Sequence, residues 1–231
     1  RLVDEILGLS HTIKAIAGGI EGGTFVLEKG IELGHREYLL KGWEMTKNSI
    51  QRIERLALDI LSYARSADLQ CTVCDPNLPA REMAELVRPR AEAENIYLRT
   101  ELDPTLGTLS FDQERINRCL LDLLTNATES FPPEKRDRDK KEIVLRTLKV
   151  EGGGVEYQVI DNGSGMDEKT KKNIFRRFFT TKGEKGTGVG LMAAKKTVEA
   201  HGGALQVESE EGNGTTIRIR LPQQQDHSKK S

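Results

Sequence analysis

The sequence contains little of what marks several specialised classes of protein. It has only three cysteines in 231 residues, an odd number that argues against a disulfide framework. No apolar run approaches the roughly 20 residues that a membrane-spanning helix needs, and we expect no signal peptide in this sequence. Neither sign of charge is in excess, because 35 Lys and Arg residues balance 36 Asp and Glu residues. A net charge of -1 gives the chain no general attraction to nucleic acid or to an anionic bilayer.

What remains is a soluble composition with 36% hydrophobic and 31% charged residues, which excludes membrane and fibrous proteins. This length suits one large domain or two small ones. Because the sequence starts without methionine and directly with helical patterning, we expect it to be a fragment of a longer protein.

The first 67 residues read as two long helices that form an antiparallel hairpin. In the first helix, apolar residues recur at alternating steps of four and three, from Leu2 to Ile20, and Leu27 continues the series. A second seam of this kind runs from Trp43 to Ala64. Two helices alone bury two such seams poorly, so the pattern predicts a homodimeric four-helix bundle.

The first helix contains many glycines, each costing about 1 kcal/mol relative to alanine. Gly18 and Gly22, like Gly19 and Gly23, are spaced four apart and lie along one side of the helix. The spacing is compatible with close helix packing or with a built-in bend, and the sequence does not decide between them.

Residues 68–79 carry two cysteines and two prolines and are predicted to be a linker. From residue 80 to 222, helical and alternating strand patterns succeed one another, including a hairpin around Gly152–Gly154 and two final strands around Gly212–Gly214. The pattern predicts an α/β sandwich, a mixed sheet with helices on one face. The polar tail, residues 223–231, is predicted to be disordered.

Four motifs in this second domain carry the chemistry. Asp161–Met166 places a carboxylate and two glycines at the end of a strand. Gly186–Leu191 is a glycine-rich turn that opens a helix, where backbone N–H groups can bind phosphates. Phe175–Lys182 lies between them, and Leu124–Ala127 lies on an upstream helix. Each motif alone is weak, but their order and spacing together are hard to explain by structural needs alone.

With these motifs the chain resembles the sensor histidine kinases and the wider superfamily that they share with DNA gyrase, the Hsp90 chaperones and MutL. Asn126 matches the N box, Asp161–Gly165 the G1 box, Phe175–Phe179 the F box and Gly186–Gly190 the G2 box. The Phe-Phe-Thr-Thr-Lys stretch, Gly-Thr-Gly-Val-Gly-Leu and His201-Gly202-Gly203 look most like the nitrogen-regulator and C4-dicarboxylate sensor branch.

The resemblance implies a role for each motif residue in binding ATP and Mg²⁺. Asp161 would accept a hydrogen bond from the adenine amino group, and Thr215 would bond near the adenine. Asn126 would bind Mg²⁺ through its side-chain oxygen, which suits an ion that keeps much of its hydration shell. Lys182 would act as a point charge at the γ-phosphate. Two glycines would let the backbone approach the base, Gly163 and Gly165. Three others would let a lid close on the triphosphate, Gly186, Gly188 and Gly190.

The first domain resembles the dimerisation and phosphoacceptor hairpin of the family, and His11 stands at the position of the phosphorylated histidine. His11 lies about 200° around the helix from both Leu9 and Ile13, so it is expected to point into solvent. An acceptor must be exposed, with one imidazole nitrogen neutral and free to attack phosphorus. The alternative is an ordinary surface histidine.

Two departures from the family pattern concern the neighbours of His11. Relatives usually carry Glu or Asp directly after the histidine, where this chain has Thr12. Relatives often carry Thr or Asn four residues after it, where this chain has Ala15, which puts phosphatase activity in doubt. Autophosphorylation therefore needs another base.

Asp122 is a candidate for this base because it lies one helical turn before Asn126 on the same face. Many histidine kinases have Asn there, whereas gyrase-like ATPases and one histidine kinase branch place an acidic general base there. The alternatives are that Asp122 only helps to hold Mg²⁺ through water, or that it is only a conservative match in shape.

Cys71 and Cys74 form one C-x-x-C pair, too few ligands for a structural zinc site unless a second copy supplies the other pair. Cys119 is expected in the core.

Taken together, the sequence predicts the cytoplasmic catalytic core of a two-component sensor histidine kinase, whose full-length form is compatible with an upstream membrane anchor. ATP would phosphorylate His11, and the phosphoryl group would pass to an Asp of a response-regulator receiver domain; no nucleic acid and no membrane contact are expected for this fragment. Two alternatives stay open, an ATP-hydrolysing conformational switch that uses Asp122 as general base, and a dimeric scaffold with a degenerate acceptor site.

Overall fold

The computed structural model describes residues 2–64, 69–132, 140–176, 179–181 and 188–223, and within these it leaves out the side chains of residues 2–8, 11, 55 and 58–64. The chain divides into two compact units. The first comprises Arg1–Ser66 and Ile174–Met192, and the second comprises Ala67–Asn173 and Ala193–Ser231. No helix in the described part of the chain is both long enough and apolar enough to span a bilayer.

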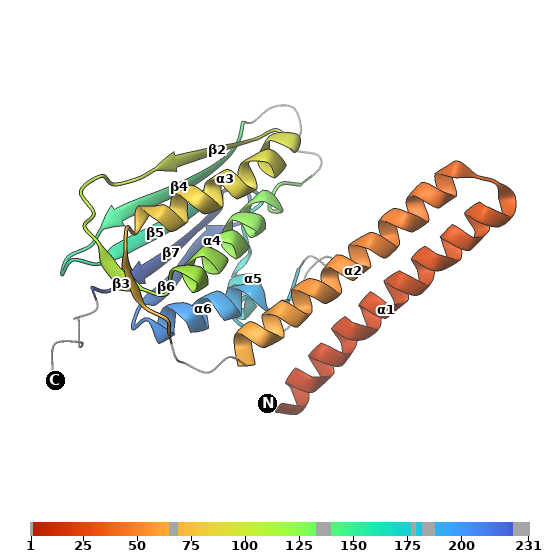
Figure 1. Cartoon of the computed structure of the whole chain (residues 1–231), viewed down its shortest axis with the longest axis horizontal. Coiled ribbons are helices and arrows are strands. Elements are labelled where there is room, and N and C mark those ends of the chain that lie inside the picture. Colours follow the sequence, from red (N-terminus) through yellow and green to blue (C-terminus); the bar gives the residue numbers. More distant parts are fainter. Residues whose placement is uncertain (1, 65–68, 133–139, 177–178, 182–187, 224–231) are drawn as a thin grey trace. The chain divides into compact units, whose positions relative to one another are not determined.

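The first unit is built on a hairpin of two long helices, α1 (Leu2–Leu33) and α2 (Arg36–Ala64), shown in Figure 1. The chain reverses at Gly34, whose φ of 66° lies in the left-handed region that glycine adopts without strain. The N–H of His35 donates to the carbonyl of Gly30 at 3.0 Å and so closes the end of α1. The predicted helical hairpin is therefore confirmed.

The glycines of α1 let the backbones of the two helices approach closely. A Cβ on Gly23 would lie 2.8 Å from the backbone nitrogen of Thr46 and 3.1 Å from the carbonyl oxygen of Gly42. A Cβ on Gly30 would lie 2.8 Å from the backbone nitrogen of Leu39, whereas one on Gly18 would meet nothing within 4 Å. Close helix packing therefore explains Gly23 and Gly30 but not Gly18.

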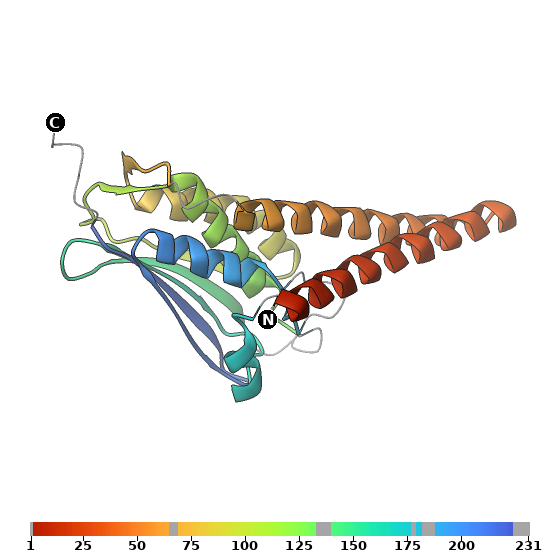
Figure 2. The same ribbon diagram turned by 90° about the horizontal axis from the view of Figure 1, so that it is seen from below.

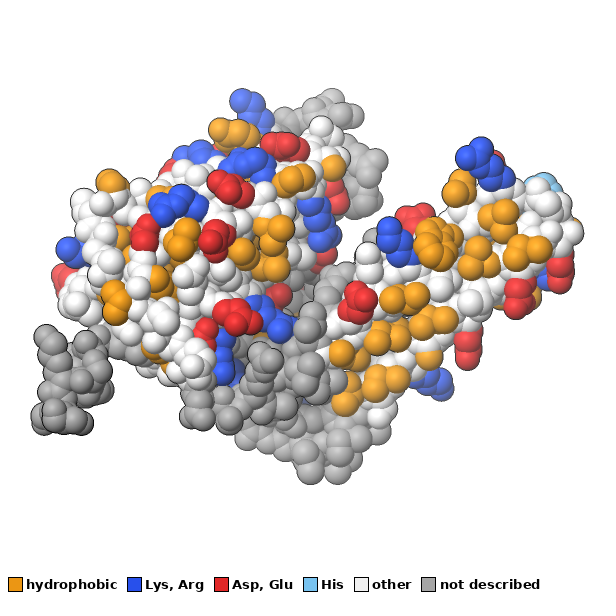
Figure 3. Space-filling model, viewed as in Figure 1, with side chains coloured by type: hydrophobic (Ala, Val, Ile, Leu, Met, Phe, Trp, Pro, Cys, Tyr) orange, Lys and Arg blue, Asp and Glu red, His pale blue; other side chains and the backbone are white. Residues whose placement is uncertain are grey.

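One apolar seam of the hairpin stays on its surface. Ile16 and Leu56 are 1% and 5% exposed, and Val189 packs with them in the core of the first unit. By contrast, Trp43 is 59% exposed, and both Ile50 and Ile53 are 47% exposed. Figure 3 shows hydrophobic side chains gathered along one face of the two helices.

The second unit holds a five-stranded sheet in the order β2-β4-β5-β7-β6. The β2–β4 pair is parallel and the other pairs are antiparallel, which makes the sheet mixed as predicted. The strands are β2 (Ile96–Glu101), β4 (Lys141–Lys149), β5 (Val155–Asp161), β6 (Ala204–Glu210) and β7 (Gly214–Leu221).

Helices cover one face of this sheet and leave the other face open, as Figure 2 shows. The covering helices are α3 (Asn77–Ala93), α4 (Gln113–Thr128) and α6 (Gly190–Ala200), and a short helix α5 (Glu168–Asn173) follows β5. Alternate residues of the central strands fill the core beneath the helices. Examples are Leu145, Tyr157 and Ile219, each at most 1% exposed. The predicted α/β sandwich is confirmed.

The structure differs from the sequence-based expectation at residues 72–79, which were predicted to be linker. Thr72–Cys74 forms strand β1, which pairs antiparallel with β3 (Leu109–Phe111), and α3 already begins at Asn77. The Tyr157 hydroxyl donates to the carbonyl oxygen of Pro76 at 2.8 Å. The segment is thus tied to the sheet by bonds that its cysteines and prolines do not reveal.

Candidate nucleotide-binding site

The candidate site lies where β5 ends at Asp161. This carboxylate is 8% exposed and stands in register with Thr215 on β7, which in turn pairs with Ser209 on β6. The hydroxyls of Ser209 and Thr215 are 2.9 Å apart. Three polar side chains from neighbouring strands therefore form one row, and the row contains the two residues that were predicted to contact adenine.

The turn after Asp161 and the end of α4 both hold this carboxylate. Oδ1 of Asp161 accepts the backbone N–H of Gly163 at 2.9 Å. The Ser130 hydroxyl, just beyond α4, lies 3.0 Å from the same oxygen. The orientation of the carboxylate is therefore fixed by the protein itself.

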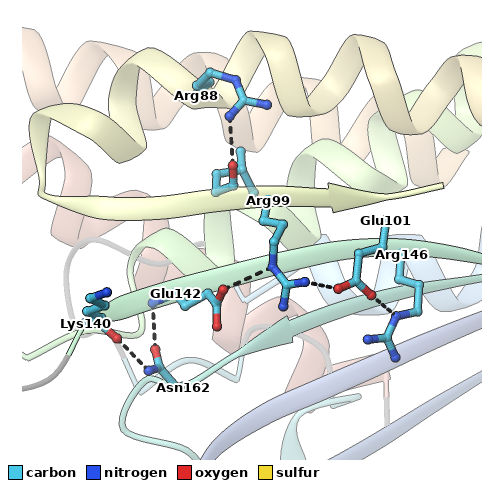
Figure 4. A network of polar contacts seen from close by, with 8 residues as sticks. Arg88, Arg99, Glu101, Lys140, Glu142, Arg146 and Asn162 are labelled. Atoms are coloured by element: carbon cyan, nitrogen blue, oxygen red, sulfur yellow. Dashed lines mark hydrogen bonds and ion pairs between the residues drawn. The ribbon is translucent and has the colours of Figure 1, made fainter.

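Asn162 fastens the turn to the start of β4, as Figure 4 shows. Its Oδ1 accepts the N–H of Glu142 at 2.8 Å, and its Nδ2 donates to the carbonyl oxygen of Lys140 at 2.8 Å. Further along the outer face, the guanidinium of Arg99 bonds Glu142 at 3.1 Å and also contacts Glu101. These outer ion pairs are partly exposed, so they stabilise the strand pairs only modestly.

The glycines of two motifs pack directly against each other. Gly165 has a φ of 63° and Gly214 a φ of 91°, so both occupy the left-handed region. A Cβ on Gly165 would collide with the carbonyl oxygen of Glu210, and one on Gly214 with that of Asp161. The N–H of Gly212 also donates to the Ser164 carbonyl at 2.7 Å. These glycines are therefore already required by contacts within the protein, apart from any approach to a base.

The other face of the candidate site is supplied by α4. Asp112 caps this helix by accepting the N–H of Arg115 at 3.1 Å. The buried stripe of α4 includes Leu120, Leu123 and Leu124, which anchors the helix on the sheet. Asp122 and Asn126 are both half-buried and lie one turn apart on this helix. Their roles as base and Mg²⁺ ligand stay predictions.

His201 is a polar side chain in the core whose partners the sequence did not indicate. It is 2% exposed, and its Nε2 accepts the backbone N–H of Asp112 at 3.0 Å. Its Nδ1 lies 2.7 Å from the carbonyl of Thr197, so the neutral tautomer carries its proton on Nδ1. Burial lowers the pKa of His201, which keeps it neutral. The carboxylate of Asp112 also accepts the N–H of Gln70 at 3.0 Å, so this histidine joins α6, α4 and the segment before β1.

Several predicted site residues lie outside the described residues or belong to the first compact unit, so their place in the site stays a prediction. Lys182 and Gly186 lie outside the described residues. Gly188, with a φ of 65°, and Gly190, the first residue of α6, belong to the first compact unit. His11 lies on α1, and its side chain is outside the description.

The three cysteines are free thiols whose pKa values are all raised. Burial raises the pKa of Cys119 to about 12, and burial also raises those of Cys71 and Cys74. Among the residues that the structure describes, no three or more His, Cys, Asp and Glu side chains are grouped to hold a metal ion.

One family model matches the second half of the chain. Residues 111–225 match the family model described as "Histidine kinase-, DNA gyrase B-, and HSP90-like ATPase". This range contains α4, the end of β5 and β7, which carry Asn126, Asp161 and Thr215. This part of the chain therefore resembles that ATPase family.

Relatives that match most of the chain include sensor histidine kinases. The sensor histidine kinase ZraS of Escherichia coli (strain K12) is 29% identical over 215 residues, which are 93% of this chain and 44% of ZraS. The chain thus spans less than half the length of that relative. The predicted resemblance to sensor histidine kinases is confirmed.

Two solved structures share the fold. The histidine kinase ThkA in complex with the response regulator protein TrrA matches with a TM-score of 0.74 and 25% identity, covering 93% of this chain and 60% of that one. Full-length ShkA in complex with AMPPNP matches with a TM-score of 0.67 and 26% identity, covering 80% of this chain and 39% of that one.

Proposed function

We propose that this chain is the catalytic core of a two-component sensor histidine kinase, which binds ATP with Mg²⁺ and phosphorylates His11. The observation that carries the proposal is the buried, doubly bonded Asp161 beside Thr215 in a domain that resembles this ATPase family. The likeness to a kinase bound to AMPPNP supports ATP as the nucleotide.

Adenine recognition follows from the charge of Asp161. An ionised carboxylate only accepts hydrogen bonds, so it can pair with the amino group of adenine but not with the carbonyl that guanine presents at that place. Asp161→Ala should weaken ATP binding at least about tenfold in calorimetry while the chain stays folded, and the wild type should bind GTP weakly or not at all. Equal affinity for ATP and GTP would contradict this role.

The residues of α4 suit Mg²⁺. Asn126 offers an amide oxygen, a hard ligand of the kind that Mg²⁺ accepts together with waters and phosphate oxygens. Held there, the ion would neutralise charge on the phosphates. Asn126→Ala should therefore weaken ATP binding in the presence of Mg²⁺ and have much less effect in its absence.

In the proposed reaction, a ring nitrogen of His11 forms a bond to the γ-phosphorus while the bond to the bridging oxygen breaks and ADP leaves. Incubation with labelled ATP should yield acid-labile, base-stable phosphate that His11→Ala removes without changing ATP affinity. His201 is a poor rival acceptor because both its ring nitrogens are engaged in the core. Free phosphate without labelled protein would instead favour an ATPase.

Asp122 is our candidate for the base that accepts the imidazole proton, a contribution of about 10²–10⁴-fold in rate. Asp122→Asn keeps the shape and removes the charge. We expect the rate of His11 phosphorylation to fall at least about tenfold with ATP affinity little changed. A mutant that works at the wild-type rate, or whose deficit extra Mg²⁺ rescues, would reject the base role.

The exposed seam of the hairpin suits a second copy of the chain, which would complete a four-helix bundle. Ile50→Glu combined with Ile53→Glu should convert a dimer to a monomer in light scattering after gel filtration. Tyr97→Glu is the control, because Tyr97 is 64% exposed on β2, which belongs to the second unit. A double variant that stays dimeric would place the interface elsewhere.

The phosphoryl group would then pass to an Asp of a response-regulator receiver domain, as the likeness to a kinase solved with its regulator supports. Because ATP and receiver domains are found in the cytoplasm, we assign the chain to that compartment.

A further inference from the structure

Ser130 connects α4 to the Asp161 turn through two of its groups. Its hydroxyl lies 3.0 Å from Oδ1 of Asp161, and its carbonyl accepts the backbone N–H of Ser164 at 2.9 Å. Ser130 follows the C-cap residue Glu129 and stands four residues after Asn126. No motif of the sequence singles it out.

The hydroxyl has one proton and faces two acceptors, Asp161 and the carbonyl of Ala127, which lies at 2.8 Å. That carbonyl already accepts one backbone N–H group, from Ser130 itself at 3.2 Å. A hydrogen bond to an ionised carboxylate is about twice as strong as one between neutral groups. The hydroxyl proton therefore belongs on Oδ1 of Asp161.

The lack of a side chain at Gly163 leaves room for the contact between Ser130 and Asp161. A Cβ at this position would collide with the Ser130 hydroxyl and would lie 2.8 Å from Oδ1 of Asp161. Ser130, Asp161 and Gly163 thus form one cluster, in which Gly163 supplies a backbone donor and leaves room for the Ser130 donor. Both donors act on the same carboxylate oxygen.

We propose that Ser130 is a positioning residue for adenine recognition, which fixes the Asp161 carboxylate so that Oδ2 meets the amino group of the base. The inference rests on the proposed role of Asp161 in binding ATP. Two donors on Oδ1 stop the carboxylate from rotating about its last bond, and this preorganisation raises affinity only for a nucleotide that has the amino group.

The test compares ATP with purine riboside 5′-triphosphate, which is ATP without the amino group. The ratio of the two dissociation constants, measured by calorimetry with Mg²⁺, isolates the bond to Asp161. We expect a ratio of about ten or more in the wild type, and a ratio near one in Asp161→Ala. Ser130→Ala should lower the ratio about three- to tenfold while the affinity for purine riboside triphosphate stays within about twofold.

Ser164→Ala is the matched control, because the Ser164 side chain is exposed on the same turn and its hydroxyl does not contact Asp161. It should keep the wild-type ratio. If Ser130→Ala fails to fold, Ser130→Cys, with its weak thiol donor, takes its place in the comparison.

The outcomes separate the two proposals. A ratio that Asp161→Ala leaves unchanged would refute the role of Asp161 in adenine binding, and the inference with it. A ratio that falls in Asp161→Ala but not in the Ser130 variant would refute only the inference. Equal weakening of both nucleotides in the Ser130 variant would show a merely structural role and would also refute it.

Discussion

Replacement of His201 should remove a pH-dependent part of the stability of the second unit. The imidazole is 2% exposed, and Nε2 accepts from Asp112 while Nδ1 donates to Thr197. Protonation would put a hydrogen on Nε2, where it would face the N–H of Asp112. The native state therefore holds this histidine neutral.

The sign follows from the lowered pKa. Burial, the largest cause, lowers the pKa of His201 below 6.5, although the nearby charge of Asp112 opposes this shift and that of Arg115 adds to it. Below about pH 6.5 the unfolded chain binds a proton that the native state does not, so stability falls as the pH falls. If the native histidine stays neutral throughout, the loss between pH 7.5 and 5.5 reaches about 1.4 kcal/mol.

His201→Gln keeps a polar amide at this place and removes the titration. We expect it to lower the free energy of unfolding by about 1–3 kcal/mol at pH 7.5, because its bonds to Asp112 and Thr197 are weaker. The free energy of unfolding should also depend less on pH. Urea denaturation read by pulsed hydrogen exchange of the β5 peptide reports the second unit alone. His35→Gln is the control, because His35 is exposed at the turn of the hairpin. If the free energy of unfolding changed with pH as steeply in His201→Gln as in the wild type, the reasoning would be refuted.

Three further predictions concern packing. Tyr157→Phe leaves the buried carbonyl of Pro76 without its hydroxyl donor and should lower the free energy of unfolding by about 1–2 kcal/mol in urea; an unchanged midpoint would contradict this. Maleimide at pH 8 should label Cys119 in the native protein far more slowly than the other two cysteines, by mass spectrometry, because of its pKa of about 12. Gly23→Ala should lower the thermal midpoint of the hairpin, whereas Gly18→Ala, with open space around it, should leave or raise it.

Local patterns were sufficient to predict most elements of the fold. The heptad steps from Leu2 to Ile20 follow from the geometry of one helix on another, and the alternation in 143–147, 155–159, 204–209 and 215–221 follows from a sheet with one covered face. The strand β1 was missed because three residues carry no period, and its pairing with β3 joins segments about 37 positions apart.

The candidate site was predicted in part for the same reason. Asp161 and its glycines lie in one short motif, so they could be found together. The partners of His201 and Asp161 could not, because Asp112 lies 89 positions from His201 and Ser130 lies 31 positions from Asp161. A serine or histidine in isolation has no pattern that distinguishes a surface residue from one that orients a carboxylate or a helix.

Gly163→Ala offers a direct test of how tightly the carboxylate is held. Gly163 does not adopt a positive φ, so alanine brings no backbone strain there, and its only cost is the collision with Ser130 and Asp161. The methyl group must displace the Ser130 hydroxyl or turn the carboxylate, and either change disturbs the acceptor for adenine. We expect ATP affinity to fall at least about tenfold in calorimetry, the size of one hydrogen bond to a charged group. Gly107→Ala, at a glycine with nothing within 4 Å and no positive φ, should bind ATP as the wild type does. Unchanged affinity in a folded Gly163→Ala variant would show that the carboxylate adapts freely, and would refute the claim that it is held tightly.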